Sequence, residues 1–362
     1  MLKNWLKPVP KEIIPSKISR TSFFKNIQVF QTALPDLTNT HIAIVGIEED
    51  SANAIRKALY QSAYAFRKLQ IADLGNIRKQ DVQFIGPLIK ELISGKIIPI
   101  IIGSNVNFTL AQYQAHHHQL VNLVLIDEKI RVSPRSKNAN LIIDAIIKSN
   151  KSNLLHLAVL GYQAHFTPPA VARYLELRNY EHIRLGSIRS KIEDIEPIIR
   201  DADLISFNIA SIRQSDAPEQ IAPSPSGFFV EEACQLSKYA GMSDKLSSIG
   251  FWGYYPQTKT NQTAQVVSQL IWYFIDGFSK RTMDYPTSTE GLVEYIVELK
   301  GAIKELTFWK SKKSGRWWIQ VPVKTRKKYL RHRLIPCSYK DYIQTCKEDI
   351  PDRLLNAFKR FA

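Results

Sequence analysis

Residues 122–131 read Asn122-Leu123-Val124-Leu125-Ile126-Asp127-Glu128-Lys129-Ile130-Arg131, an apolar run that passes directly into a charged loop. The run does not alternate between apolar and polar side chains, which indicates a parallel strand buried on both faces. Comparable runs occupy residues 42–46, 98–103, 155–161, 203–207 and 246–251. Helical patterns lie between them, at residues 54–68, 81–94, 138–148, 169–178, 230–239 and 262–278. The alternation predicts an α/β fold whose mainly parallel, doubly wound sheet lies between two layers of helices.

Three loops are expected to meet at one edge of this sheet. They begin at Gly103, Asp127 and Asn208, each at the end of a predicted strand. In a doubly wound sheet the carboxyl ends of the parallel strands share one edge, and ligand sites form there. The sequence therefore predicts a functional site built from these three loops.

The composition is that of a folded protein without a membrane span. Hydrophobic residues make up 44% and charged residues 23% of the 362 positions, which is ordinary for a globular chain. No apolar run approaches the roughly 18 residues of a spanning helix, and the first residues do not have the pattern of a signal peptide. The three cysteines, Cys234, Cys337 and Cys346, have no metal-binding or redox spacing. A sparse, odd number of cysteines suits a reducing compartment, so we expect a cytoplasmic protein.

Positive charge is concentrated toward the ends of the chain. The net charge is +16, and residues 300–362 hold 17 Lys and Arg against 5 Asp and Glu. Such an asymmetry indicates an anionic partner at the basic end. The plainer interpretation is a basic tail that only keeps the protein in solution.

The last part of the chain is expected to be an ordered appendage. Residues 308–321 have the pattern of a β-hairpin, with a turn at 312–315. Ser338, followed three residues later by Asp341, fits the N-cap of a short helix, and Pro351 opens a final helix. The apolar face of that final helix would hold Leu354, Leu355, Phe358 and Phe361.

A basic stretch at residues 324–333 lies between the hairpin and these helices. Basic residues interleaved with aromatic ones suit phosphate contact and base stacking, or an interface with an acidic protein. We expect Trp317 and Trp318 to seal the appendage against the sheet domain, and the basic stretch to form a surface for a partner. The candidate binding residues are Lys324, Arg326, Lys327, Lys328, Arg331 and Arg333.

Six short segments within residues 38–280 occur in an order typical of one enzyme family. They are Ala54-Ile55-Arg56-Lys57-Ala58-Leu59-Tyr60, Asp73-Leu74-Gly75-Asn76-Ile77, Gly103-Ser104-Asn105-Val106-Asn107, Ser206-Phe207-Asn208-Ile209-Ala210 with Asp216-Ala217-Pro218, Pro225-Ser226-Gly227-Phe228 with Glu232, and Phe251-Trp252-Gly253-Tyr254-Tyr255-Pro256. With the Asp127–Arg131 loop they resemble the ureohydrolase family of arginases, agmatinases and formimidoylglutamases, and formimidoylglutamase-like members are the most similar. The resemblance implies a three-layer α/β/α, arginase-like fold.

The resemblance also implies a site for two Mn²⁺ ions, and most of its ligand positions are changed in this chain. Active members hold the ions with a histidine from the first loop, Asp-His-Asp from the second and two aspartates from the third. The corresponding residues here are Val106, Asp127, Lys129, Arg131, Asn208 and Ala210. At the substrate site, the guanidine-recognising glutamate of the family falls on Gly253, and Glu232 falls on the glutamate that follows the Pro-Gly-Gly turn.

Only Asp127 keeps the ligand type of the family. Mn²⁺ is a fairly hard ion that prefers several carboxylates helped by imidazole, and two cations, Lys129 and Arg131, would repel it. We therefore expect Lys129 or Arg131 to pair with Asp127 and to fill the metal cavity. The sequence predicts no metal cofactor, and no catalytic residue is assigned.

Three functions remain open on the sequence. The first is a non-catalytic ureohydrolase-fold protein that acts in binding or assembly through its basic surface. The second is a divergent metal-dependent C–N hydrolase of the formimidoylglutamase, agmatinase or arginase type, acting on linear amidines or guanidines. The third is a nucleic-acid-binding protein. The expected partner of the basic surface is an acidic protein or a nucleic acid. The resemblance also implies a homo-oligomer, because members of the family form trimers or hexamers.

We expect a basic N-terminal segment at residues 1–37, a ureohydrolase-like domain at 38–285, and a basic, aromatic-rich extension at 286–362. Within the domain, His116-His117-His118 is expected to be solvated, because three adjacent histidines point in different directions and cannot all bind one ion. His156 has the position of a core histidine in a buried strand. Arg184 and Arg189 either bind an anion or have surface and packing roles.

Overall fold

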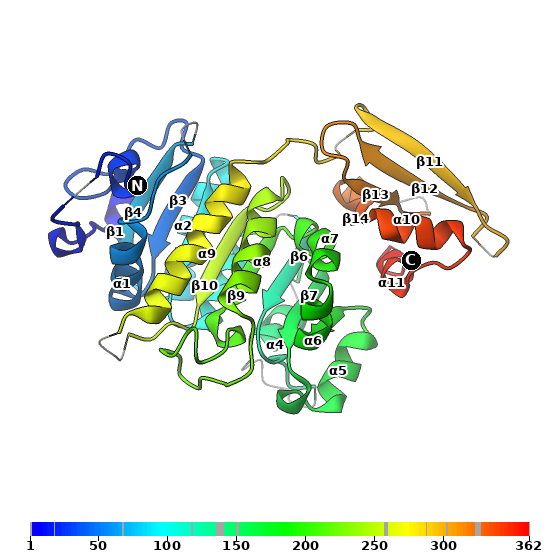
Figure 1. The fold of residues 1–362 in the computed structure, drawn as a ribbon, viewed down its shortest axis with the longest axis horizontal. Coiled ribbons are helices and arrows are strands. Elements are labelled where there is room, and N and C mark those ends of the chain that lie inside the picture. The colour runs from blue at the N-terminus through cyan, green and yellow to red at the C-terminus, as the bar shows by residue number, and fades with distance from the viewer. Residues whose placement is uncertain are drawn as a thin grey trace.

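A long, mainly parallel sheet runs through the larger part of the chain (Figure 1). The computed structural model describes residues 2–17, 19–66, 69–116, 119–134, 141–149, 152–256, 260–286, 288–301, 303–322 and 327–361. Within these residues the strand order is β1-β4-β3-β5-β10-β9-β6-β7-β8, and β2 also pairs with β4. Its strands are β1 (Leu6–Lys7), β2 (Gln28–Val29), β3 (Ile42–Gly46), β4 (Ile71–Ile77), β5 (Ile98–Ile102), β6 (Val121–Ile126), β7 (Leu154–Tyr162), β8 (Glu181–Arg184), β9 (Leu204–Asn208) and β10 (Ser248–Trp252).

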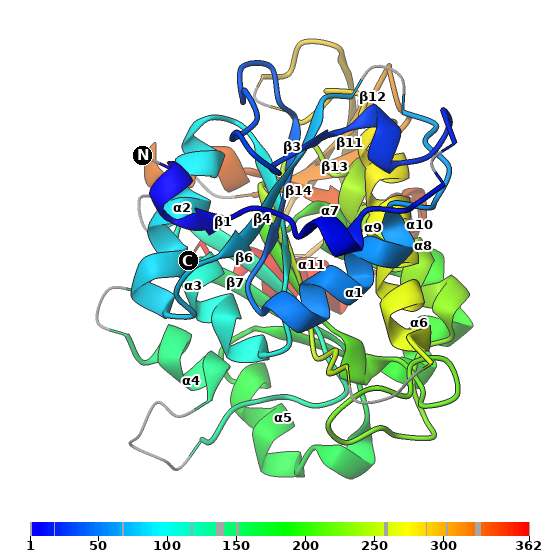
Figure 2. The same ribbon diagram turned by 90° about the vertical axis from the view of Figure 1, so that its left-hand side faces the viewer.

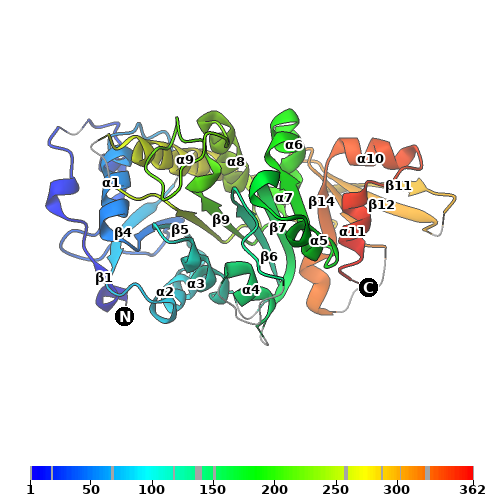
Figure 3. The same cartoon turned by 90° about the horizontal axis from the view of Figure 1, so that it is seen from below.

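Helices cover both faces of this sheet, and Figure 3 shows α8 and α9 on one side and α2, α3 and α4 on the other. They are α1 (Glu49–Leu59), α2 (Val82–Ser94), α3 (Thr109–Gln114), α4 (Ile142–Ile147), α5 (Pro169–Glu176), α6 (Leu185–Ser190), α7 (Glu196–Arg200), α8 (Val230–Met242) and α9 (Gln262–Phe278). In β3, Ile42 and Ile44 join the core beneath α1, α8 and α9, whereas Ala43 and Val45 join the core beneath α2 and α3. Because both faces are buried, the strand needs apolar residues at successive positions. The predicted three-layer α/β/α fold is confirmed.

The continuous apolar runs of the sequence are confirmed as β3, β5, β6, β7, β9 and β10. Strands β4 and β8 escape the sequence analysis because neither is a continuous apolar run. Asp73, Gly75 and Asn76 interrupt β4, although every residue of that strand is buried. Strand β8 reads Glu181-His182-Ile183-Arg184 and lies at the end of the strand order in the described part of the chain.

The predicted helices agree with the structure to different degrees. Helix α9 has the predicted bounds, and α2, α5 and α8 differ from prediction by a few residues. Helix α1 runs from Glu49 to Leu59, whereas the prediction placed a helix at 54–68. The chain leaves the helix after Leu59, and Ala63 pairs with Ser22 in an isolated β-bridge. Residues 67 and 68 of that prediction lie outside the described residues. Helix α4 covers only Ile142–Ile147, and residues 138–140 of that prediction lie outside the described residues.

A buried ion pair fixes α1 against β4. Arg56 donates from Nε and NH2 to the two carboxylate oxygens of Asp73 at 2.8 and 2.9 Å, and both side chains are fully buried. Tyr60 donates its hydroxyl to Asp73 at 2.8 Å, and Arg56 also donates to Asn76 and to the carbonyl of Gly75. A buried pair is tolerated when its remaining donors and acceptors are satisfied in this way. The contact explains why the sequence carries both an arginine in the first helix and an Asp-Leu-Gly segment in the next strand.

The N-terminal segment adds two short strands beside β4. Leu6 of β1 pairs antiparallel with Ile77, and Gln28 of β2 pairs in parallel with Ala72. Figure 2 looks onto this end of the molecule, with β1, β4 and α1 toward the viewer. Part of residues 1–37 is therefore built into the sheet.

The C-terminal appendage has its own sheet and its own core. Strands β11 (Leu292–Glu298), β12 (Glu305–Ser311), β13 (Trp317–Gln320) and β14 (Leu334–Cys337) form an antiparallel sheet in that order. The predicted hairpin is confirmed, since β12 and β13 pair with Trp309 opposite Trp318. Helices α10 (Tyr339–Cys346) and α11 (Asp352–Phe358) follow. No helix within the described residues is both long and apolar enough to cross a membrane.

Local signals in the appendage are confirmed as well. Ser338 caps α10 by accepting from the backbone N–H of Asp341 at 3.1 Å, and Asp341 in return accepts from the N–H of Ser338 at 2.7 Å. In α11, Leu354 and Phe358 are buried in the core of the appendage. The predicted apolar face of the last helix is therefore used for packing.

The two tryptophans of β13 are both buried but do different things. Trp318 lies beneath the guanidinium of Arg200, whose Cζ is 4.7 Å from the ring centroid, so this ring does seal the appendage against the sheet domain. Arg200 also donates to the carbonyl of Cys337 at 3.1 Å. Trp317 instead stacks on Tyr342 inside the appendage, with ring centroids 4.9 Å apart. The prediction is confirmed for Trp318, and Trp317 belongs to the core of the appendage.

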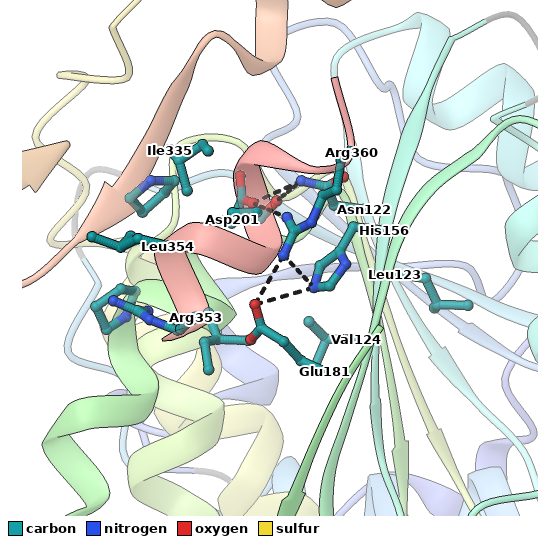
Figure 4. A pocket seen from close by; sticks show the side chains of 14 residues that line it. Asn122, Leu123, Val124, His156, Glu181, Asp201, Ile335, Arg353, Leu354 and Arg360 are labelled. Atoms are coloured by element: carbon teal, nitrogen blue, oxygen red, sulfur yellow. Dashed lines mark hydrogen bonds and ion pairs between the residues drawn. The ribbon is translucent and has the colours of Figure 1, made fainter. Parts of the chain in front are cut away.

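The appendage docks on the amino ends of the sheet strands around a small cavity lined by both apolar and charged side chains (Figure 4). Arg360, just after α11, donates from NH2 to Glu181 and to Nε2 of His156, both at 2.9 Å. Because Nε2 accepts this hydrogen bond, His156 is neutral. Burial, and then the charge of Arg360, lower the pKa of His156. The predicted core position of His156 is confirmed, and the residue faces the appendage.

A second group of charges joins the two parts next to this cavity. Lys245 is 2.7 Å from the carboxylate of Asp201 and 3.7 Å from that of Asp203, and it lies 3.2 Å from Nδ1 of His332. His332 ends the 3₁₀ helix η8 (Lys327–His332) of the appendage, and its neighbour Arg331 forms an ion pair with Asp203. Asp203 is fully buried, so it needs these counter-charges.

The first histidine of the His116–His118 run is buried, which corrects the expectation that the run is solvated. His116 is only 2% exposed. One of its ring nitrogens lies 2.9 Å from the carbonyl oxygen of Gln112, and the other lies 2.8 Å from the hydroxyl of Ser247. The other two histidines lie outside the described residues. Two hydrogen bonds offset the cost of burying the neutral ring.

We predict that mild acidification destabilises the protein through His332. Burial, and then Lys245, lower the pKa of His332 to about 4, whereas a histidine in the unfolded chain titrates near 6.5. Between these values the unfolded chain binds a proton that the folded chain excludes, so the free energy of unfolding falls as the pH decreases from about 6.5 to 4. Urea unfolding at pH 7 and pH 5 measures the decrease.

The matched variant His332→Asn keeps an acceptor near the position of Nδ1 but does not titrate. Its free energy of unfolding should decrease less between the two pH values than that of the wild type. Equal decreases in the two proteins would mean that His332 does not have the expected role.

Candidate functional site

The loops at the carboxyl edge of the sheet line one pocket of about 300 Å³. Residues from the ends of β5, β6, β9 and β10 form its walls, which confirms that the loops beginning at Gly103, Asp127 and Asn208 meet. The predicted site positions in its lining are Val106, Lys129, Arg131, Asn208, Ala210 and Gly253. Asp127 directly follows β6 and is held against Arg131 at the wall of the pocket.

Asp127 is bound by its loop and by the neighbouring strand. Arg131 donates from Nε to one carboxylate oxygen at 2.6 Å and from NH2 to the other at 3.2 Å. Asn208 donates from Nδ2 to the first oxygen at 3.1 Å, while its own Oδ1 accepts from the N–H of Ala210. Both oxygens of Asp127 therefore accept hydrogen bonds from protein groups, and the predicted pairing of Arg131 with Asp127 is confirmed.

The second cation of the loop has a different partner. Lys129 Nζ lies 3.1 Å from the carboxylate of Glu128, which is almost fully buried. Arg131 NH2 is 4.0 Å from the same carboxylate. Burial lowers the pKa of Arg131, but the charge and hydrogen bonds of Asp127, with Glu128, raise it by more, so the net shift is upward. The guanidinium is thus a permanent positive charge in this pocket.

The side chains at the six positions do not fit a pair of Mn²⁺ ions. Val106, the first residue of the 3₁₀ helix η4 (Val106–Phe108), and Ala210, in the 3₁₀ helix η7 (Ile209–Ser211), carry no ligand atom. Asn208 uses both ends of its amide in the contacts just described, and Arg131 covers Asp127. Within the described residues, no three His, Cys, Asp or Glu side chains are grouped so that they could hold a metal ion.

The two predicted substrate-site positions lie apart from each other. Gly253 lines the pocket with a φ of +94°, and a Cβ there would lie 2.5 Å from Oδ1 of Asn208, so only glycine fits. Glu232 is in the first turn of α8, where it accepts from the N–H of Phe229 at 2.8 Å and from Nε of Arg189 at 3.0 Å. Glu232 therefore caps its own helix and is not part of the pocket lining.

Two polar residues of this edge escape the sequence analysis. Glu48, just before α1, accepts from the N–H of Ser104 at 2.9 Å, and burial raises its pKa. Tyr255, two residues after Gly253, lines the pocket with it. The signal that could have indicated Glu48 is its place two residues after the apolar run 42–46, because such residues lie at the carboxyl edge.

The predicted basic surface is divided by the structure. Lys324 and Arg326 lie outside the described residues, and Lys327 and Lys328 begin η8. Arg333 is exposed. The prediction that Arg331 belongs to this surface is corrected by the structure. Arg331 is the counter-ion of buried Asp203 and joins the appendage to the sheet domain.

We predict that Arg131→Met lowers the free energy of unfolding by about 2 kcal/mol. Removing one partner of a fully buried ion pair costs roughly 3–5 kcal/mol. We expect a smaller loss here because Arg131 is partly exposed, so that solvent screens the pair. The double variant Asp127→Asn/Arg131→Met should recover most of the loss, since a neutral amide needs no counter-charge. Urea unfolding of the four proteins of this cycle measures both effects, and additive losses in the double variant would mean that the two side chains are not coupled.

Comparison with known proteins agrees with this architecture. No family model matches the chain. The formimidoylglutamase of Staphylococcus haemolyticus is 26% identical over 223 residues, which covers 57% of this chain and 71% of that protein.

Solved structures show the same fold at lower sequence identity. A formimidoylglutamase from Bacillus subtilis superposes with a TM-score of 0.63 at 17% identity, over 78% of this chain and 98% of its own. A formiminoglutamase from Trypanosoma cruzi, solved with Mn²⁺, gives 0.62 at 16% identity, over 69% and 97%. An agmatine ureohydrolase from Thermoplasma volcanium gives 0.55 at 16% identity, over 73% and 96%. The chain is therefore a homologue of formimidoylglutamase with the fold of the arginase/ureohydrolase superfamily of hydrolases.

Proposed function

We propose that this chain is a non-catalytic protein on a ureohydrolase fold and that it acts in binding or assembly. The observation that carries the proposal is the bidentate ion pair of Arg131 with Asp127, whose two hydrogen bonds measure 2.6 and 3.2 Å. A formiminoglutamase with this fold has been solved with Mn²⁺. In this chain a fixed cation covers Asp127, the one carboxylate that the resemblance of its loop to the family's metal-binding loop would assign to metal binding.

The physical argument concerns charge. Metal-dependent hydrolysis uses the charge of the ions to lower the pKa of a bound water, which then attacks the substrate. Ions of this kind would have to enter a pocket that already holds the guanidinium of Arg131 and the ammonium of Lys129. Repulsion between like charges at short range opposes their entry. The same two cations also pair with Asp127 and Glu128, so a metal ion would have to displace a bound cation to reach either carboxylate.

The partner that we propose is anionic, either an acidic protein or a nucleic acid, and it contacts the basic stretch at residues 324–333. Exposed Arg333 supports this proposal, and Arg331 is set aside because it holds Asp203. Charge reversal of Lys324, Lys327 and Lys328 leaves the docking contacts of Arg331 and His332 in place. Binding of a nucleic acid should fall steeply with salt and be lost in this variant, whereas binding of an acidic protein should survive competition by RNA and DNA.

The alternative is a divergent metal-dependent C–N hydrolase acting on linear amidines or guanidines. The observation in its favour is that Asp127, which keeps the ligand type of the family, still lies at the carboxyl edge and is followed by a second buried carboxylate, Glu128, although the described residues hold no group of three metal-ligating side chains. Purified protein supplied with Mn²⁺ should nevertheless fail to hydrolyse formimidoylglutamate, agmatine or arginine. Turnover above that of an Asp127→Asn control would establish the hydrolase and end the proposal.

A restored variant tests the same proposal from the other side. We predict that replacing the changed positions with family ligands creates a site for about one or two Mn²⁺ ions per chain. The substitutions are Val106→His, Lys129→His, Arg131→Asp, Asn208→Asp and Ala210→Asp. The control Arg131→Lys keeps the positive charge and should take up no Mn²⁺. A restored variant that folds but binds no more Mn²⁺ than this control would show that the ligand positions have been assigned incorrectly.

A further inference from the structure

A second pocket at the carboxyl edge is lined by three arginines. It has a volume of about 560 Å³ and lies at the ends of β7 and β8, against the loop that follows β9. Its lining includes Arg184, Arg189 and Arg213, and no carboxylate is found among the described residues that line it. This site is hereafter the arginine pocket, and it is separate from the pocket of Arg131.

Two of the arginines are held on one aromatic ring. The Cζ atoms of Arg189 and Arg213 lie 3.8 and 4.1 Å from the ring centroid of Phe229. Each guanidinium is also fixed through Nε, Arg189 to Glu232 at 3.0 Å and Arg213 to Asp216 at 2.9 Å. Neither carboxylate belongs to the pocket lining. In the described structure the terminal NH1 and NH2 groups of both arginines make no hydrogen bond to the protein, so they can donate to a ligand.

The third arginine is positioned by a chain of polar groups. Arg184 donates from Nε to the hydroxyl of Tyr162 at 3.2 Å. That hydroxyl lies 3.2 Å from Nδ1 of His182, whose Nε2 is 3.5 Å from the carboxylate of Glu176. The arrangement is consistent if Tyr162 accepts from Arg184 and donates to a neutral His182. The terminal nitrogens of Arg184 again make no hydrogen bond within the described residues.

The three guanidiniums of this pocket offer hydrogen-bond donors that the oxygens of an anion can accept. A guanidinium presents parallel N–H donors that match the oxygens of a phosphate or a carboxylate, and such charge-assisted bonds are stronger than neutral ones. The exposed hydroxyls of Ser187 and Ser226 add two donors to the same wall. The Nε contacts with Glu232 and Asp216 neutralise two of the guanidiniums, so Arg184 supplies the unpaired positive charge. The free terminal N–H groups of all three arginines still offer several donors, which suit the oxygens of a phosphate better than the two oxygens of a carboxylate.

We propose that the arginine pocket binds the phosphate group of a small molecule. Recognition is by charge and hydrogen bonding, and the ring of Phe229 is already covered by guanidiniums and is not available to stack on a base. The site does not depend on metal content or on the state of the Asp127–Arg131 pocket. It supplies this chain with an anion site that is distinct from the basic stretch of the appendage.

The test is a calorimetric titration of the full-length protein with inorganic phosphate at constant ionic strength and mildly alkaline pH. Wild-type protein should bind one phosphate per chain in a saturable manner. Arg184→Gln should raise Kd by about tenfold or more, the effect of losing a hydrogen bond to a charged group. The control Arg173→Gln removes an exposed arginine of α5 outside the pocket and should leave Kd unchanged.

Further arms make the outcome decisive. Arg213→Gln should also weaken binding, and its urea unfolding curve shows whether the loss of stacking on Phe229 has altered the fold. Arg184 is exposed and does not stack on that ring, so Arg184→Gln stays informative if Arg213→Gln does not fold. Three results would each overturn the proposal. They are a titration heat that does not saturate, equal phosphate affinity of the Arg184→Gln and Arg173→Gln variants, and tighter binding of succinate than of phosphate. The assay contains no metal, so its failure leaves the proposal for Arg131 unaffected.

Discussion

Asp127 lies at the end of a strand buried on both faces and is itself only 5% exposed, so its carboxylate requires a positive partner. In this chain the partner comes from the same loop, four residues later, as the guanidinium of Arg131. That one contact links the two ends of the loop and places a permanent cation in the pocket. It also holds the carboxylate of Asp127 where one of its oxygens accepts a hydrogen bond from Asn208. The positions of Lys129, Glu128 and Gly253 are then consistent with a pocket organised around a guanidinium.

The two edges of the sheet have different roles. At the amino ends of the strands, the buried carboxylate of Asp203 and the half-buried one of Glu181 form ion pairs with cations of the appendage, Arg331 and Arg360. Part of the basic character of the C-terminal region is therefore used to attach it to the sheet domain. At the carboxyl ends, two pockets lie side by side, and Gln163 connects them by donating its backbone N–H to the carbonyl of Glu128 and its side-chain amide to the carbonyl of Ser226.

The sequence predicts those parts of the structure that depend on local patterns, and not those that depend on contacts between distant residues. Apolar runs and helix patterns predicted most of the sheet and its layers, because burial on both faces leaves a local signature. The sequence also predicted that one of the two nearby cations pairs with Asp127, but not which one, because the choice of Arg131 depends on Lys129 binding the neighbouring buried carboxylate of Glu128 instead. Strand β4 could not, since its polar residues are buried only because Arg56 reaches them from another element. The inward position of Arg331 depends in the same way on Asp203, which is far away in the sequence.

The most direct measurement is the Mn²⁺ content of tag-free protein after dialysis against excess Mn²⁺, determined by plasma mass spectrometry with circular dichroism to verify folding. If Arg131 has taken the place of the metals, folded protein should retain close to no Mn²⁺ per chain. Retention of about one or two ions per folded chain, the occupancy of a hydrolytic site, would contradict this account of the pocket.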